Sequence, residues 1–84
     1  MPHGINIIFM NYNDYIESNS NIMLGKPLVK GTRITVELIL KNLAEGASFE
    51  DIIFAYPHLT PISIQAVLAY AYEVIANEVL INAA

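Results

Sequence analysis

The chain has 84 residues, no cysteine and a formal net charge of −4 at pH 7. This length gives a single domain with a small core, and the absence of cysteine excludes disulfide bonds and thiolate metal ligands. An acidic chain is poorly suited to general nucleic-acid binding, because that affinity comes from cations that neutralise phosphates.

Hydrophobic residues make up 55% of the sequence, above the ~45–50% of typical soluble domains. A domain this small has too little interior to bury so much apolar surface. The composition therefore predicts that the chain forms a homodimer or binds a dedicated protein partner.

The first residues are apolar in places, but they lack the basic region and the cleavage site of a signal peptide. We expect residues 1–12 to form a flexible tail and residues 13–84 to form the domain. No apolar run approaches the ~20 residues that cross a membrane. These observations favour a cytoplasmic protein that does not enter the membrane.

Residues 13–34 are predicted to be extended or irregular. A short strand is expected at Tyr15–Glu17. Further along, Leu28–Val29 and Arg33–Ile34 are expected to be extended pieces on either side of a turn. Gly31 lies in that turn, where a residue without a side chain readily takes a positive φ.

Three helices are predicted next, over residues of about 35–45, 48–56 and 60–82. Thr35, Ser48 and Thr60 stand where N-cap residues accept backbone hydrogen bonds. Asp51, three residues after Ser48, suggests a capping box, and Pro57 ends the second helix. We expect a mainly α fold, a three-helix bundle of the helix-turn-helix type preceded by a short extended or β segment.

The third predicted helix is apolar on nearly every side, a pattern typical of a helix that is buried on more than one side. One apolar stripe fills the core of its own chain. The second stripe is predicted to be a dimer interface, and it consists of Ile62, Ala66, Tyr70, Val74 and Ile81.

The basic residues are clustered between positions 26 and 41, and they are Lys26, Lys30, Arg33 and Lys41. Together with Thr32 they form the candidate site for nucleic acid or an acidic partner, and Arg33 is favoured because its planar side chain can bind a phosphate or carboxylate with two bonds. The alternative is a solvated face in which Arg33 and Thr32 serve their own fold. Glu37 and Lys41 are expected to pair along the first helix.

No catalytic, metal-binding or cofactor-binding pattern is present, so an enzyme is not expected. His58 has no evident partner, and Glu50 and Asp51 are adjacent instead of facing each other. A helix-turn-helix protein places its third helix in the DNA major groove. Here that helix has no Lys or Arg, so DNA contacts are expected from Gly25–Arg33 instead.

Three motifs in this order resemble a small bacterial family, the domain of unknown function 433: Gly25-Lys26-Pro27, Lys30-Gly31-Thr32-Arg33-Ile34 and Tyr56-Pro57-His58-Leu59-Thr60. The resemblance covers residues 21–73. The sequence departs from the family pattern at Thr35, where proline is usual, and at Leu24, before Gly25. These departures leave the turn geometry ahead of Gly25 open.

The resemblance implies a homeodomain-like three-helix fold and an antitoxin-like role, in which the protein pairs with a PIN-like ribonuclease toxin. It also implies that the protein binds its own operator DNA. We therefore expect a non-enzymatic binding protein that masks such a nuclease. The alternatives are a DNA-binding regulator of its own operon and a purely structural homodimer.

Overall fold

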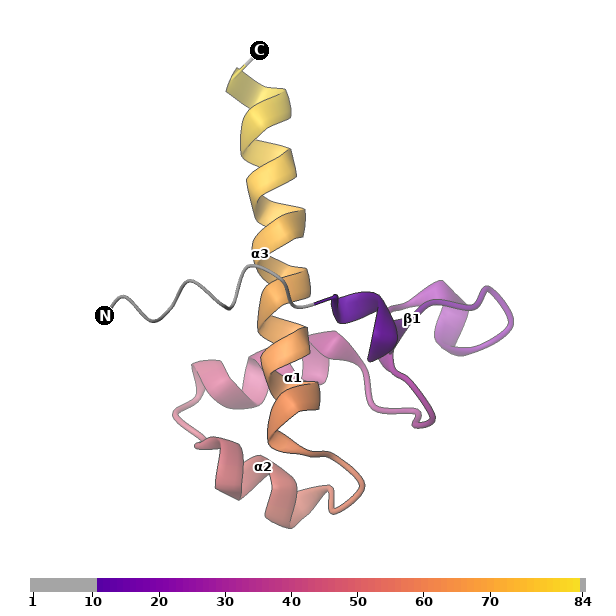
Figure 1. Ribbon diagram of the computed structural model, residues 1–84, viewed down its shortest axis with the longest axis vertical. Helices are drawn as coiled ribbons and strands as arrows, with labels where there is room; N and C mark the ends of the chain where they lie inside the picture. Colours follow the sequence, from indigo (N-terminus) through magenta and orange to yellow (C-terminus); the bar gives the residue numbers. More distant parts are fainter. Residues whose placement is uncertain (1–10, 84) are drawn as a thin grey trace.

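The computed structural model describes the backbone of residues 11–83 and the side chains of residues 11–77. The predicted tail therefore lies almost entirely outside the described residues. The elements in chain order are η2 (Tyr12–Asp14), β1 (Ile16–Glu17), η3 (Met23–Gly25), β2 (Leu28–Val29), α1 (Val36–Ala44), α2 (Phe49–Ala55) and α3 (Pro61–Ala83) (Figure 1). This order confirms a mainly α fold in which a short β segment precedes three helices.

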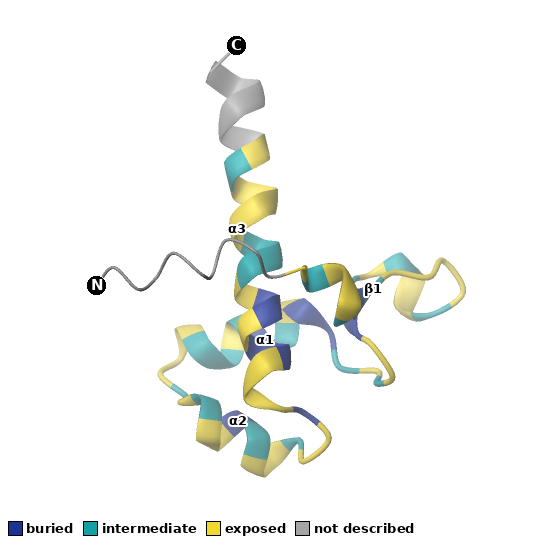
Figure 2. Ribbon diagram, in the orientation of Figure 1, coloured by how far each residue is buried: buried dark blue, intermediate teal, exposed yellow. Residues whose placement is uncertain are grey.

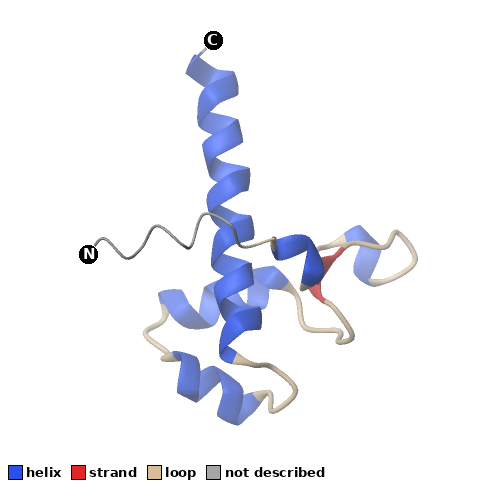
Figure 3. Cartoon of the chain, viewed as in Figure 1, coloured by secondary structure: helices blue, strands red, loops and turns tan. Residues whose placement is uncertain are grey.

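The two strands pair antiparallel, with Ile16 opposite Val29 and Glu17 opposite Leu28 (Figure 3). Ile16, Val29 and Leu28 are all buried. The strand pair therefore presents a small apolar surface to the core. Both β1 and the neighbouring η2 contact α3. The strand predicted at Tyr15–Glu17 is confirmed to within one residue.

The turn after β2 is built around Gly31, whose φ is 79°. The predicted extended piece at Arg33–Ile34 is not a strand. The backbone carbonyl of Ile34 nevertheless accepts a hydrogen bond from the Val29 amide at 2.9 Å, and Thr35 forms a single antiparallel bridge with Leu28. The chain thus returns alongside β2 for one bridge and then enters α1.

The turn ahead of Gly25, where the sequence departs from the family pattern, takes a left-handed path. Met23, Leu24 and Gly25 have φ values of 51°, 59° and 80°. A left-handed conformation costs a non-glycine residue roughly 1–2 kcal/mol. The Leu24 side chain is 93% exposed, so this turn presents an apolar tip to solvent.

The predicted helix caps are confirmed. The Thr35 hydroxyl accepts a hydrogen bond from the backbone of α1 at 3.1 Å, and the Thr60 hydroxyl accepts one from the Ser63 amide at 3.2 Å. Ser48 and Asp51 form a complete capping box, since each side chain accepts from the other residue's amide at 3.0 and 2.9 Å. Local sequence therefore fixes where each helix begins.

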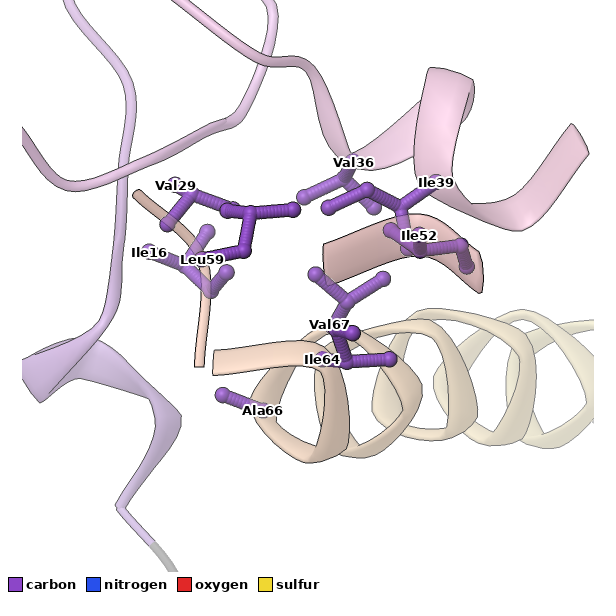
Figure 4. Packing of buried hydrophobic residues seen from close by; sticks show 9 residues of the cluster. All are labelled: Ile16, Val29, Val36, Ile39, Ile52, Leu59, Ile64, Ala66 and Val67. Carbon is purple, nitrogen blue, oxygen red and sulfur yellow. The ribbon is translucent and has the colours of Figure 1, made fainter. Parts of the chain in front are cut away.

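The core lies where the three helices and the β segment meet. Ile39 of α1, Ile52 of α2, and Ile64 and Val67 of α3 are 0–2% exposed. Burying each such side chain contributes roughly 1.5–3 kcal/mol. The cluster in Figure 4 comprises Ile16, Val29, Val36, Ile39, Ile52, Leu59, Ile64, Ala66 and Val67.

Helix α3 extends well past this core. It has 23 residues, or about 34 Å at 1.5 Å per residue, and no described residue after Val67 is buried. Its C-terminal half projects from the body of the domain (Figures 1 and 2). Over the described residues, none of the helices is both long enough and apolar enough to span a bilayer.

The capping box makes the stability of α2 sensitive to acid. Hydrogen bonds from the Ser48 backbone and side chain lower the pKa of Asp51 below its usual value. The resulting stabilisation is fully present above about pH 4, the ordinary carboxylate range, and it is lost as the pH falls through the folded-state pKa. We expect Asp51→Ala to be less stable than wild type at pH 7, and this difference to shrink by pH 3, in urea unfolding. A difference that stays constant over that range would contradict this role.

Candidate functional site

Two of the predicted binding cations are engaged within the domain. Lys26 Nζ lies 3.0 Å from Glu37 Oε1, and Lys41 Nζ lies 2.8 Å from Glu45 Oε2. The hydrogen bond to Glu45 raises the pKa of Lys41. The expected pairing of Glu37 with Lys41 is therefore wrong, because the turn before β2 brings Lys26 to Glu37 instead.

The remaining residues of the predicted basic site divide into two kinds. Lys30 donates to the Asn13 carbonyl at 3.0 Å, and the Thr32 hydroxyl bonds the backbone on either side of it at 2.7 and 3.0 Å. Thr32 is thus a structural turn residue. Arg33 is exposed and has no ion pair or side-chain hydrogen bond within the described part of the chain. Of the four cations, only Arg33 has neither an acidic partner nor a side-chain hydrogen bond among the described residues.

The predicted dimer stripe does not lie on one free face. Ile62 and Val74 are each 47% exposed, whereas Ala66 is 0% exposed and belongs to the core. Tyr70 is half-buried against η2, and the side chain of Ile81 lies outside those described. Assigning Ala66 to a dimer interface is therefore wrong, because Ala66 is buried in the core of its own chain. The assignment of Ile62, Tyr70 and Val74 stays a prediction.

Tyr12 joins the N-terminal segment to α3. Its ring meets that of Tyr70 edge to face, with centroids 5.3 Å apart and an interplanar angle of 84°. Its hydroxyl donates to Glu73 Oε1 at 3.0 Å, and this bond raises the pKa of Tyr12. Tyr12 is therefore part of the folded domain, contrary to the expectation that residues 1–12 form a tail.

An apolar groove lies between α1 and the middle of α3. Its volume is about 190 Å³, and its lining residues are Val36, Leu40, Tyr70, Ala71, Val74 and Ile75. Pockets for small ligands are larger, at roughly 300–1,000 Å³. The groove therefore suits one or two apolar side chains of a protein partner. Sequence periodicity did not reveal it, because the groove depends on how α1 packs against α3.

A second hollow beside α2 offers no evident chemistry. It has a volume of about 250 Å³ and is lined by Asn42, Ala47, Asp51, Ile52, Ala55 and Tyr56. The Asp51 carboxylate is already used in the capping box. His58 is exposed in the turn before α3. In the part of the chain that the structure describes, no group of three or more His, Cys, Asp or Glu side chains could hold a metal ion.

Comparison with known proteins places this chain among proteins of similar fold. The family model described as "Protein of unknown function (DUF433)" matches residues 16–71, which confirms the resemblance and extends it to β1. A solved structure of a DUF433 member protein from Anabaena variabilis ATCC 29413 is similar, with a TM-score of 0.67 and 23% identity over 95% of this chain and 86% of that chain. No curated protein matches this chain.

The contact between Tyr12 and Tyr70 is expected to stabilise the domain. An edge-to-face aromatic pair contributes roughly 0.5–1.5 kcal/mol. We therefore expect Tyr12→Ala to lower the free energy of unfolding by about 1 kcal/mol, as measured by urea denaturation. Tyr12→Phe is the matched control, because it keeps the ring and removes only the exposed bond to Glu73. Equal stability of the two variants would show that the ring contact contributes nothing.

Proposed function

The chain belongs to the DUF433 family of proteins of unknown function, and we propose that it is a non-enzymatic, antitoxin-like protein that masks a PIN-like nuclease. The observation that carries this proposal is the apolar groove between α1 and α3. At the edge of the groove, Val74 and Ile75 are 47% and 58% exposed. Apolar surface of this kind gains about 25 cal/mol per Å² when a partner removes it from water.

The groove supports binding to a protein segment in preference to a metabolite. None of the described residues that line it has a charged side chain, and its sides are two helices. An amphipathic helix that places apolar residues into a hydrophobic groove is a common mode of peptide recognition. The proposed contact is therefore an apolar face of the nuclease, seated between α1 and α3.

The charge of the chain supports a basic partner. Beyond Lys41 the sequence has five acidic residues and no Lys or Arg. One of the five, Glu73, precedes the groove residue Val74 in α3. A ribonuclease needs a basic groove to hold RNA phosphates, so acidic side chains beside an apolar contact complement it and favour fast association.

Co-purification with the product of the adjacent gene tests this proposal. We expect the two proteins to form a complex and co-expression to restore growth. We expect Val74→Asp to weaken capture at least about tenfold, because a carboxylate would be buried in an apolar groove without a partner. Leu24→Asp is the matched control, since Leu24 is 93% exposed in the η3 turn and does not line the groove.

Two outcomes would contradict the proposal. The first is the absence of both a complex and growth rescue. The second is a complex that Val74→Asp leaves as tight as wild type, which would place the contact elsewhere on the protein.

DNA binding is a second candidate function, and the unpaired side chain of Arg33 favours it. Arg33 follows the Gly31 turn and is exposed, so it is available to a phosphate. We expect Arg33→Ala to weaken binding to the upstream DNA and to reduce the slope of log affinity against log salt by about 0.9 per chain, in a mobility-shift assay. Lys41→Ala is the control, because Lys41 is paired with Glu45. No binding by wild type, with or without its partner protein, would dismiss this function.

A further inference from the structure

Tyr70 of α3 takes part in two features of the molecule at once. It is one of the residues that line the α1–α3 groove, and its ring also meets the ring of Tyr12, with centroids 5.3 Å apart. Tyr70 is only half-buried, and a tyrosine in a helix has two common χ1 rotamers. The position of its ring therefore depends on the groups packed against it, and Tyr12 of η2 is one of them.

The segment η2 is attached to the rest of the domain through both its first residue and the residue that follows it. The Tyr12 hydroxyl donates to Glu73 Oε1 at 3.0 Å, and Glu73 lies three residues beyond Tyr70, on the same side of α3. The Lys30 amide, next to β2, donates to the Tyr15 carbonyl at 2.7 Å. Tyr12 is thus bound to α3 at two points, and the segment that carries it is fixed to the β segment.

We propose that η2 is a strap that keeps the groove in its binding shape, with Tyr12 as the positioning residue. The Tyr12 ring fills the space beside Tyr70 and so holds Tyr70 as a wall of the groove. Without that ring, Tyr70 can turn into the vacated space, and the groove loses an apolar wall. This inference deepens the proposed function, because it rests on the same groove, but it does not depend on which protein fills that groove.

The strap and the groove are therefore coupled. A ligand in the groove packs against Tyr70 in the position that Tyr12 maintains, so it binds this form more tightly than a form in which η2 has left α3. The coupling is reciprocal by linkage, so filling the groove holds η2 more firmly on α3. The effect reaches η2 although none of the described residues that line the groove belongs to it.

Benzene is a suitable probe, because an apolar cavity of about 150 Å³ is enough to bind it and the groove has about 190 Å³. We expect a benzene titration, followed by NMR of the Leu40 and Val74 methyl groups, to show binding to wild type. Tyr12→Ala should weaken this binding at least about fivefold, whereas Tyr12→Phe keeps the ring and should bind as wild type does. Asp51→Ala is the stability control, since it also removes a stabilising contact but lies in α2, outside the groove.

Three results of this titration would overturn the proposal. The absence of methyl shifts in wild type would show that the groove does not accept an apolar group. Wild-type affinity in Tyr12→Ala would show that Tyr12 does not position Tyr70. An equal loss of affinity in Asp51→Ala would show that lowered stability alone explains the effect. Because the titration uses no nuclease, its failure is distinguishable from a failure to capture one.

Hydrogen exchange in the wild-type protein tests the reverse direction of the coupling. The Tyr15 amide donates to the Tyr12 carbonyl at 2.8 Å, so its exchange slows when η2 is held more firmly. Saturating benzene should slow this exchange by about the same factor by which Tyr12→Ala weakens benzene binding. The Gly46 amide, which donates to the Leu43 carbonyl at 3.0 Å, is the control and should keep its rate. An unchanged rate at Tyr15 would also overturn the coupling.

Discussion

The fold depends on one constraint, which is that the elements around α3 pack on its N-terminal part, from Pro61 to about Glu73. Helices α1 and α2, strand β1 and η2 all contact α3, and Ile64 and Val67 are fully buried at their meeting point. A chain of 84 residues has only enough material to surround that short stretch. The rest of α3 therefore leaves the core while it is still rich in apolar residues.

The features that the sequence predicted best are those formed by residues close together in the chain. The caps at Thr35, Ser48 and Thr60 could be predicted because a hydroxyl bonds an amide only two or three residues away. Ala66 was misassigned because periodicity identifies an apolar side of a helix without saying which element covers it. On that side of α3 the covering elements are β1 and η2, and η2 meets α3 through a contact between residues 61 positions apart. The α1–α3 groove could not be predicted for the same reason, since it depends on how two helices pack.

The apolar residues around α3 therefore lie on distinct sides of the helix. One side of α3 forms the groove with α1. A second side binds the N-terminal segment through Tyr12, and on a third side Tyr72 is exposed to solvent. Because the groove and the side that exposes Tyr72 are different sides of α3, a partner bound in the groove leaves Tyr72 uncovered.

The contact of Tyr12 with Glu73 also has a consequence for how the protein is made. A ribosome synthesises the N-terminal segment first, and domains fold as units during synthesis. Here β1 can pair with β2 early, but the surface of α3 on which η2 and β1 pack is added last. The apolar face of β1 that packs on α3 therefore stays exposed in the nascent chain until α3 has been synthesised. During that interval chaperones and proteases can reach it.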